Sequence, residues 1–386
     1  MALTDGGAEL TPRSSRFQRL WLPGFAFKAV VIGGGYATGR ELVEYFLPSG
    51  PRGGLKGMLL AALAWSIICV ITFLFALASG SRDYRSFFRS LLGKFWPLFD
   101  IAYLVCTVLV LSVFGAAAGE IGAAVFGWPR VLGTLCLLLG ITLVAGWGNE
   151  SVERLFKYVT VFLYAVYAVF IVLAFTHFGA RIAQNFASDR TTAPWAVSGL
   201  TYAGYNIIGA IVILPVLRHV TTRRDAIIAG ALCGPLAMAP AIAFFLCMIA
   251  YYPQIGSATL PSNFLLERMN VPLFHVIFQV MIFAALLESG TGTVHGVNER
   301  VAAVCRESGR GFPRFSRLGF SSGLLVISIF IAARFGLVTL IAKGYRFLAW
   351  LLLLVYVAPL LTIGLRRVWR RGSTAGREDS SQRRAD

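Results

Sequence analysis

Long apolar runs, separated by short polar or charged segments, follow one another along most of the chain. About 20 apolar residues are enough for a helix to cross a bilayer, and Gly, Pro and charge clusters mark where one run ends and the next begins. The pattern predicts ten membrane-spanning helices, at residues 25–47, 57–80, 96–125, 130–148, 156–178, 194–217, 226–252, 272–304, 318–334 and 345–365. Because the runs are unbroken rather than alternating, we expect an all-α integral membrane protein and not a β-barrel.

The segments between these runs are short. The longest connections have about 20 residues, which is less than a soluble domain needs. We therefore expect a cytoplasmic N-terminal segment at 1–24, a single transmembrane domain at 25–365 and a disordered basic tail at 366–386.

Composition and charge agree with a membrane protein. Hydrophobic residues make up 57% of the chain and charged residues 14%, against about 25% charged residues in a soluble domain. The net charge is +17, but the basic residues lie in loops and tails, so we expect no nucleic-acid partner. If the chain starts inside, 25 of its 35 Lys and Arg residues fall on the inner side, which predicts cytoplasmic termini. The six cysteines are scattered singly and are interpreted as small core residues.

The first predicted span contains a segment that is unfavourable for a helix. Three consecutive glycines at 33–35 are followed within a few residues by the charged pair Arg40 and Glu41. Each glycine costs a helix about 1 kcal/mol relative to alanine, and broken backbone at membrane depth must be buried in protein or line a cavity. A glycine-packed helix crossing is the alternative, but it leaves the two charges unexplained.

The sixth predicted span repeats this pattern. Glycine and polar residues interrupt it at 198–206, and a Leu-Pro pair follows at 214–215 as another does at 47–48, an offset of 167. Glu120 and Glu288, each the lone acid in the middle of its span, are 168 residues apart. A common shift of five spans predicts a 5+5 inverted repeat, because an odd number of spans reverses the orientation. The repeats cover about 25–178 and about 194–334, with helix ten at 345–365 in the second.

Three motifs carry a resemblance to known proteins. They are Gly-Gly-Gly-Tyr-Ala-Thr-Gly-Arg-Glu at 33–41, Thr-Tyr-Ala-Gly-Tyr-Asn at 201–206 and Glu-Ser-Gly-Thr-Gly-Thr-Val-His-Gly-Val-Asn-Glu-Arg at 288–300. These motifs resemble the YkvI-like bacterial membrane proteins. The 5+5 arrangement with discontinuous helices one and six resembles the LeuT-type fold of the amino acid–polyamine–cation superfamily. The resemblance covers all ten predicted spans and implies a location in the bacterial cytoplasmic (inner) membrane.

The resemblance also implies a central site near the bilayer midplane, between the broken spans and the faces of spans three and eight. Unwound backbone frees carbonyls for a cation, and half-helix amino ends attract anionic groups. The candidate substrate-binding residues are Gly34, Gly35, Tyr36, Ala37, Glu120, Tyr202, Gly204, Tyr205 and Asn206. Arg40 and Glu41 are candidates for a gating ion pair.

Span eight contains candidates for binding a coupling ion. Glu288, Thr291, His295 and Glu299 fall on one helical stripe,. The LeuT-type pattern places a sodium ion between carbonyls of span one and hydroxyls of span eight. The candidate cation-coupling residues are therefore Gly33, Glu288, Ser289, Thr291 and Thr293. Glycines separate these hydroxyls, unlike the adjacent pair common in the family, so a sodium site stays open, with helix–helix hydrogen bonding as the alternative.

Glu288 and Glu120 are expected to face one cavity, because an ionised carboxylate at mid-membrane depth is costly unless it is paired. Each is a candidate to carry a coupled proton, to bind a cationic group of the solute or to balance Arg40. The alternative is a purely structural pair between Arg40 and a glutamate. Lys157 is a weaker candidate for the coupling site.

The expected function is secondary active transport of a small polar or zwitterionic solute, an amino acid or a related amine, coupled to Na⁺ or H⁺. No cofactor is expected beyond a possible bound Na⁺. By analogy with the LeuT-type fold, alternating access would move spans one, two, six and seven against spans three, four, eight and nine. The alternative is a transporter-like ligand sensor without net transport. An enzyme is not expected, because catalytic groups are not clustered, and the oligomeric state stays open.

Overall fold

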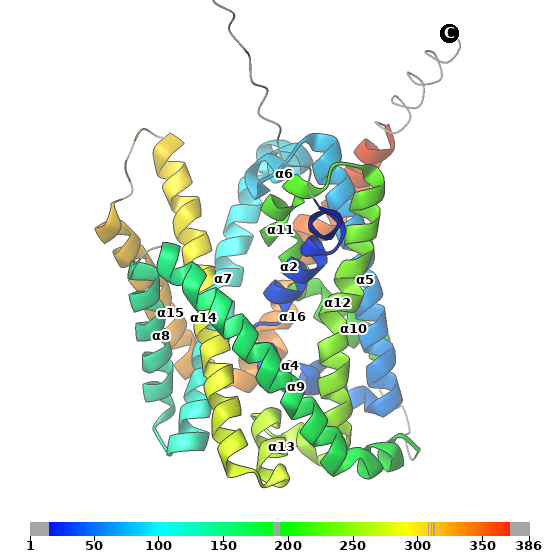
Figure 1. Ribbon diagram of the computed structural model, residues 1–386. Helices are drawn as coiled ribbons and strands as arrows, with labels where there is room; N and C mark the ends of the chain where they lie inside the picture. Colours follow the sequence, from blue (N-terminus) through cyan, green and yellow to red (C-terminus); the bar gives the residue numbers. More distant parts are fainter. Residues whose placement is uncertain are drawn as a thin grey trace, which may run out of the picture.

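The computed structural model describes residues 15–147, 149–187, 194–307, 309, 311 and 313–370. Over these ranges the chain forms helices joined by short loops and contains no strand, as predicted. The long helices are α5 (Gly50–Ser79), α7 (Pro97–Phe126), α8 (Arg130–Trp147), α9 (Asn149–Ala187), α12 (Arg223–Ile249), α14 (Pro272–Glu307) and α15 (Arg314–Thr339). Both ends of the described chain lie at the same end of the bundle (Figure 1), which requires an even number of crossings.

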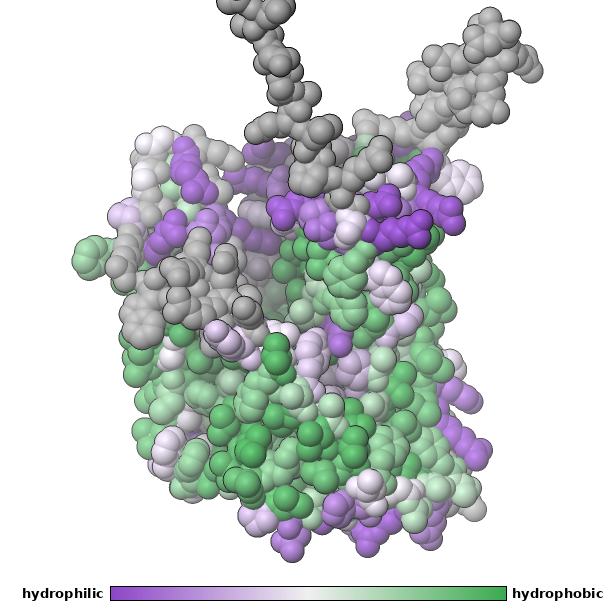
Figure 2. Space-filling view, viewed as in Figure 1, coloured by the Kyte–Doolittle hydropathy of each residue, from purple (hydrophilic) through white to green (hydrophobic). Residues whose placement is uncertain are grey.

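The surface has the polarity of a membrane protein. Figure 2 shows a broad hydrophobic band between hydrophilic ends, and large apolar side chains such as Leu139, Phe330 and Leu354 are well exposed. Exposing so much apolar surface to water would be unfavourable, whereas contact with lipid is favourable.

Six helical stretches of the described chain are long and apolar enough to cross a membrane. They are Arg40–Ser79, Pro97–Phe126, Tyr158–Ala187, Arg223–Ile249, Pro272–Arg306 and Phe315–Arg370. The last stretch holds two predicted spans, because helical structure continues through a kink at Gly336, whose φ is 69°. The count of ten helices and the 5+5 repeat therefore remain predictions.

The first predicted span is discontinuous, as expected. It consists of α2 (Leu22–Val31), α3 (Gly34–Ala37) and α4 (Arg40–Tyr45). Helix α2 ends where Ile32 takes a non-helical ψ of 70°. Gly39 separates α3 from α4 with a φ of 77°, a conformation that glycine adopts without strain. A Cβ on Gly39 would lie 2.6 Å from the ring of Phe244, so both conformation and space require glycine here.

The sixth predicted span is also interrupted. Helix α10 (Trp195–Asn206) ends before the turn at Ile207 and Ile208, and α11 (Gly209–Val212) follows. Both broken spans then continue into a 3₁₀ turn that contains the Leu-Pro pair, at Leu47–Ser49 and Leu214–His219. In both spans a half-helix is followed by a break and the 3₁₀ turn comes last, but the first span has two short helices, α3 and α4, where the sixth has only α11.

The helices pack into two groups. In the first group, α5 contacts α10 and α12, and α12 contacts α2; helices α7, α8, α14 and α15 form the second group. Helix α9 packs against both α12 and α14 and crosses the front of the bundle diagonally (Figure 1). This grouping matches the expected division between spans one, two, six and seven and spans three, four, eight and nine.

Glycines allow close approach within each group. Gly234 of α12 lies against α5, and Gly133 of α8 lies against α7. A Cβ at Gly234 would overlap the carbonyl oxygen of Ala62, and one at Gly133 would overlap that of Ala118. Close helix packing through small residues is the usual device inside membranes, where lipid provides no hydrophobic drive for helices to associate.

Three shorter helices lie outside the predicted spans: α1 (Arg16–Leu20), α6 (Tyr84–Leu92) and α13 (Pro261–Met269). Helix α6 lies at the end of the bundle that holds the chain ends, and α13 lies at the opposite end (Figure 1). Asp83 caps α6 by accepting hydrogen bonds from the backbone amides of Arg85 and Ser86, each at 2.9 Å. The tenth predicted span contains α16 (Tyr345–Leu352) and π-helical turns at Leu353–Val357 and Leu360–Gly364, and a further π-helical turn at Leu340–Gly344 directly precedes it.

Candidate functional site

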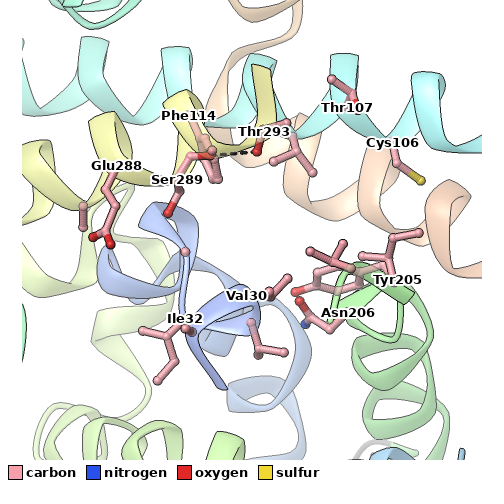
Figure 3. A pocket seen from close by; sticks show the side chains of 18 of the residues that line it. Val30, Ile32, Cys106, Thr107, Phe114, Tyr205, Asn206, Glu288, Ser289 and Thr293 are labelled. Carbon is pink, nitrogen blue, oxygen red and sulfur yellow. Dashed lines mark hydrogen bonds between the residues drawn. The ribbon is translucent and has the colours of Figure 1, made fainter. Parts of the chain in front are cut away.

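A cavity of about 380 Å³ lies where the two broken helices meet. The ends of α2 and α10 form part of its wall, and α7, α9, α14 and α16 complete it. Side chains with polar groups line it at Glu41, Tyr103, Thr107, Thr160, Tyr164, Tyr205, Asn206, Glu288, Ser289, Thr293 and Tyr345. In Figure 3 Glu288 and Ser289 lie on one side of the cavity and Tyr205 and Asn206 on the other, with Val30 and Ile32 between them.

The charges around this cavity favour a cation. Among its described lining residues, Glu41 and Glu288 are acidic and none is Lys or Arg. The carboxyl ends of α2 and α10 also reach the wall, at Val31 and Asn206. A helix carboxyl end carries about half a negative charge, so both helix ends add to the field of the two carboxylates.

The Glu288 side of the cavity brings oxygen atoms together from three elements. The Thr160 hydroxyl of α9 donates to Glu288 Oε1 at 3.0 Å. A Cβ built at Gly33, in the break after α2, would lie 3.8 Å from the Ser289 hydroxyl. The Thr293 hydroxyl donates to the carbonyl of Ser289 at 2.7 Å, shown as the dashed line in Figure 3. Four of the five predicted cation-coupling residues, namely Gly33, Glu288, Ser289 and Thr293, therefore line one cavity.

The other side is built around Glu41, whose carboxylate is buried. The hydroxyl of Tyr205 donates to Glu41 Oε2 at 2.5 Å, and Glu41 is only 5% exposed. The ring of Tyr345 from α16 stacks on Tyr205, with 4.4 Å between the ring centroids. Asn206 donates to the carbonyl of Tyr202 at 3.2 Å, near the end of α10. Tyr205 and Asn206 are thus placed in the cavity, as the sequence predicted.

Arg40 does not line the cavity. Its guanidinium contacts Glu44 of its own helix at 3.0 Å and donates to the carbonyls of Gly256 and Ala258 at 3.3 and 3.0 Å. The amide of Ser262 also donates to the carbonyl of Thr38 at 3.1 Å. These contacts connect the break between α3 and α4 to the segment leading into α13. Arg40 pairs with Glu44 and not with Glu288 or Glu120.

The prediction that Glu120 and Glu288 face one cavity is wrong. Glu120 forms an ion pair with Arg130 Nε at 2.7 Å and is not among the residues that line the cavity. Glu120 lies in the last two turns of α7, and Arg130 begins α8 after a short turn. The connection between α7 and α8 therefore brings a cation next to Glu120, whereas Glu288 receives only a neutral hydroxyl from Thr160.

Thr291 is placed differently from its neighbours on α14. Its side chain is fully buried and its hydroxyl has no hydrogen-bond partner, but it does not line the cavity. Successive helix residues are turned by about 100°, so Ser289, Gly292 and Thr293 face the cavity while Thr291 points away. Glu299, at the end of the predicted stripe, pairs with Arg317 at 2.9 Å and is not among the residues that line the cavity.

Most of the remaining predicted residues lie outside this cavity. Tyr36 and Ala37 line a second, smaller cavity. Tyr202 is fully buried against Phe46 and Trp65, and Gly204 packs on Ala349 of α16. Gly34 and Gly35 are helical in α3, and whether they reach the cavity lies outside what the structure describes of them. The side chain of Lys157 lies outside the described residues.

Sequence reasoning missed Thr160 and Tyr164 of α9, Tyr103 and Thr107 of α7, and Tyr345 of α16, all of which line the cavity. Single Thr and Tyr residues in an apolar helix give no local signal, because their role depends on which way the helix faces. Lys28 of α2 also lies close by, with its ammonium 4.3 Å from the centroid of the Tyr164 ring.

No protein-family model matches the chain. Among curated proteins, it is similar to "Uncharacterized membrane protein YkvI" of Bacillus subtilis (strain 168). The two are 24% identical over 339 residues, which cover 83% of this chain and 89% of the relative. The resemblance to YkvI-like membrane proteins is therefore confirmed.

Solved structures with the same fold include MhsT in complex with L-phenylalanine, with a TM-score of 0.62, 15% identity and coverage of 92% of this chain and 97% of the other. Mhp1, a nucleobase-cation-symport-1 family transporter solved in a closed conformation with bromovinylhydantoin bound, matches with a TM-score of 0.56 and 13% identity over 93% of this chain and 80% of the other. These likenesses confirm the LeuT-type fold.

Proposed function

We propose that this protein is a secondary active transporter of a small polar or zwitterionic solute, an amino acid or a related amine, coupled to Na⁺ or H⁺. The cavity between the broken helices carries this proposal. It holds two carboxylates and two helix carboxyl ends, and no Lys or Arg among its described lining residues. Such a cavity attracts a positively charged group. The transporter Mhp1, which shares the fold, supports the same class of function.

Within this cavity, Glu288 is proposed to bind the ammonium group of the solute. It is half-buried and accepts a hydrogen bond from the neutral hydroxyl of Thr160, so an arriving cation would satisfy its charge. The neighbouring oxygens of Gly33, Ser289 and Thr293 suit sodium, which as a hard cation takes oxygen ligands. If a proton is used instead, the buried Glu41 is the proposed carrier.

The proposed transport cycle is alternating access. The group formed by α2, α5, α10 and α12 would move against the group formed by α7, α8, α14 and α15. The cavity lies between the two groups and is lined by both, so a change in their relative position would open it to one side or the other.

The first test is thermal stabilisation of the purified protein by a panel of amino acids and amines, in Na⁺ and in K⁺ buffer and at two pH values. A ligand that binds the folded state raises the unfolding temperature by mass action. We expect a hit that is lost in Glu288→Gln. A hit that needs Na⁺ and is lost in Ser289→Ala would identify sodium coupling, whereas one that depends on pH and on Glu41→Gln would identify proton coupling.

Uptake of the same compound into proteoliposomes separates transport from sensing. We expect accumulation driven by a gradient of the coupling ion. Binding without uptake would favour the alternative, a membrane ligand sensor without net transport. If no compound in the panel stabilises the protein at either pH and in either buffer, the amine-transporter proposal is wrong.

A further inference from the structure

A lysine without a carboxylate partner stands beside the main cavity, the one of about 380 Å³ that Glu288 lines. Lys28 lies three residues before the end of α2 at Val31 and is half-buried. Its ammonium lies 4.3 Å from the centroid of the Tyr164 ring. In the part of the chain that the structure describes, it forms no ion pair with an acidic residue. Ionisable residues inside a membrane-spanning segment are costly, and they are functional candidates by default.

Glu288 carries the opposite charge and is also without a charged partner. Its carboxylate accepts the hydrogen bond from Thr160, and among the described residues no Lys or Arg forms an ion pair with it. Thr160 and Tyr164 are four residues apart on α9, and both line the main cavity. Side chains of a helix lean towards its amino end, so the Tyr164 ring lies over the turn that contains Thr160. Helix α9 therefore brings an unpaired cation and an unpaired carboxylate to neighbouring positions on one face.

The separation of the two charges suits an α-amino acid. Four residues of helix rise about 6 Å, which places the Lys28 ammonium and the Glu288 carboxylate roughly 5–10 Å apart. An α-amino acid with a hydrogen bond of about 3 Å at each end joins two partners that are roughly 9 Å apart. Lys28 itself lies just outside the cavity wall, which begins at the next residue, Ala29. Because a lysine stem is flexible, the ammonium can leave the Tyr164 ring for a carboxylate in the cavity.

The two charges also belong to different helix groups. Lys28 is on α2, in the first group, and Glu288 is on α14, in the second. A molecule with both an ammonium and a carboxylate would bridge the groups, whereas a simple amine would contact only the second. A ligand shifts a conformational equilibrium only through contacts that differ between the states, so the bridging molecule is the one suited to move the groups.

We propose that Lys28 binds the carboxylate of the solute while Glu288 binds its ammonium. This inference rests on the proposed function and narrows it. The solute is an α-amino acid with a free carboxylate and not a simple amine, and Lys28 is the residue that selects between them. A simple amine would bring a second cation close to Lys28, and the two like charges would repel each other.

The test compares amino acids with the amines that lack only their carboxylate: alanine with ethylamine, leucine with isoamylamine, and phenylalanine with phenethylamine. Dissociation constants for the full-length protein come from the rise in unfolding temperature with ligand concentration. We expect at least one amino acid to bind about tenfold more tightly than its amine. The amide of that amino acid, which keeps the ammonium but is neutral at the carboxyl end, is expected to bind no more tightly than the amine.

Substitution of Lys28 is expected to move the two series in opposite directions. In Lys28→Met, which keeps the length of the side chain, the amino acid should bind about tenfold more weakly. The matched amine should bind about twofold more tightly, because a nearby like charge is removed. Lys28→Arg, which keeps the charge, should retain the preference for the amino acid. Lys56→Met, exposed on α5 and outside the cavity walls, should leave both series unchanged. A loss of folding would weaken both series together and cannot produce opposite changes.

The outcomes separate the two proposals. If an amine binds and is lost in Glu288→Gln, but the carboxylate adds no affinity or its contribution survives in Lys28→Met, the Lys28 inference is wrong and the proposed function stands. If Lys28→Met tightens both series equally, Lys28 competes with the solute for Glu288, and the inference is again wrong. If neither the amino acids nor the amines bind, the proposed function and this inference both fail.

Discussion

Thr160 shows how a single side chain in the scaffold supports the site. It donates the hydrogen bond to Glu288, and valine has nearly the same shape without the hydroxyl. We expect Thr160→Val to weaken amine binding about fivefold, since a hydrogen bond to a charged group contributes about 1 kcal/mol or more. Thr176→Val on the same helix is the control, because Thr176 is exposed and bonds only within the helix. Equal effects of the two changes would contradict the role of Thr160.

The Glu41–Tyr205 contact makes a separate prediction about stability. Tyr205→Phe removes the hydroxyl that donates to a buried carboxylate, and leaving such a group unpaired costs about 1–3 kcal/mol. We therefore expect a lower unfolding temperature for Tyr205→Phe than for the unchanged protein. In the background of Glu41→Gln, the same Tyr205→Phe change is expected to have a smaller effect. Leaving a buried neutral amide without a hydrogen bond costs less free energy than leaving a buried carboxylate without one. Equal effects in both backgrounds would show that the contact is not energetically coupled.

At the residue scale, the sequence identified two kinds of cavity residue: those next to the helix breaks, and polar or acidic residues that rarely occur in membrane-spanning helices. Tyr205, Asn206, Glu288 and Ser289 were predicted and line the cavity. Glu120 was predicted for the same reason as Glu288, but its partner Arg130 comes from a loop geometry that periodicity does not reveal.

At the element scale, the contact of α12 with α5 depends on a glycine. A Cβ at Gly234 would overlap the backbone of Ala62, whereas nothing lies within 4 Å of the Cβ position at Gly323 of α15. We expect Gly234→Ala to lower the unfolding temperature, because the two helices must separate. Gly323→Ala is expected to leave it unchanged or raise it, since alanine is the better helix former. A higher unfolding temperature for Gly234→Ala would contradict the close contact.

Helix α6 depends on its cap at Asp83. Partial burial alone would raise the pKa of Asp83, but hydrogen bonds from the Ser86 hydroxyl and from the amides of Ser86 and Arg85 outweigh it, and the pKa lies below its usual value. Because the folded-state pKa is lowered, the stabilisation is present above about pH 4, the unfolded value, and is lost as the pH falls through the folded value.

We expect Asp83→Ala to destabilise α6 by about 1 kcal/mol at neutral pH, seen as faster amide exchange in that helix. Asp83→Asn, which can still cap, should stay close to the unchanged protein. The difference between Asp83 and Asp83→Ala should shrink below about pH 4. A difference that grows in acid would refute the capping argument.

Element prediction succeeded where length and apolarity decide the structure. The predicted spans 96–125 and 130–148 agree with α7 and α8 to within a few residues. Helices α6 and α13 were missed because nine residues with charged positions fall below any membrane-span criterion. The breaks in spans one and six were predicted, because glycine and charge are unfavourable there in any intact helix.

At the scale of the whole molecule, the contacts of Arg40 with Glu44, Gly256 and Ala258 connect α4 to the segment leading into α13, which lies at the end of the bundle opposite the chain ends. We infer that they close the cavity on that side. Cys106 lines the main cavity and reports on its access. In a variant that retains only Cys106, we expect a membrane-impermeant maleimide to react from the side of the chain ends and not from the other.

Arg40→Gln is expected to allow reaction from the opposite side as well, because it removes the ion pair with Glu44. A variant that retains only Cys136, which is exposed on the outside of α8, is the control for lipid-facing thiols. Equal reaction of Cys106 from both sides in the unchanged protein would show that Arg40 does not close the path.

The division into two helix groups was expected from the resemblance to the LeuT-type fold and not from the sequence pattern itself. The second cavity was not expected, since it depends on how α9 crosses both groups. No pattern in one sequence sets that crossing.

The short helices of the broken spans also have a consequence for how the chain is made. Segments α3 and α11 have four residues each, and helices of that length do not form alone. When the ribosome has delivered only the first broken span, the backbone around Gly39 faces lipid without the partners it later contacts, among them Phe244 and Ser262. The first span therefore reaches its final form only after residues more than two hundred positions later have been synthesised. A nascent chain arrested before α12 should accordingly be a substrate for membrane quality-control proteases.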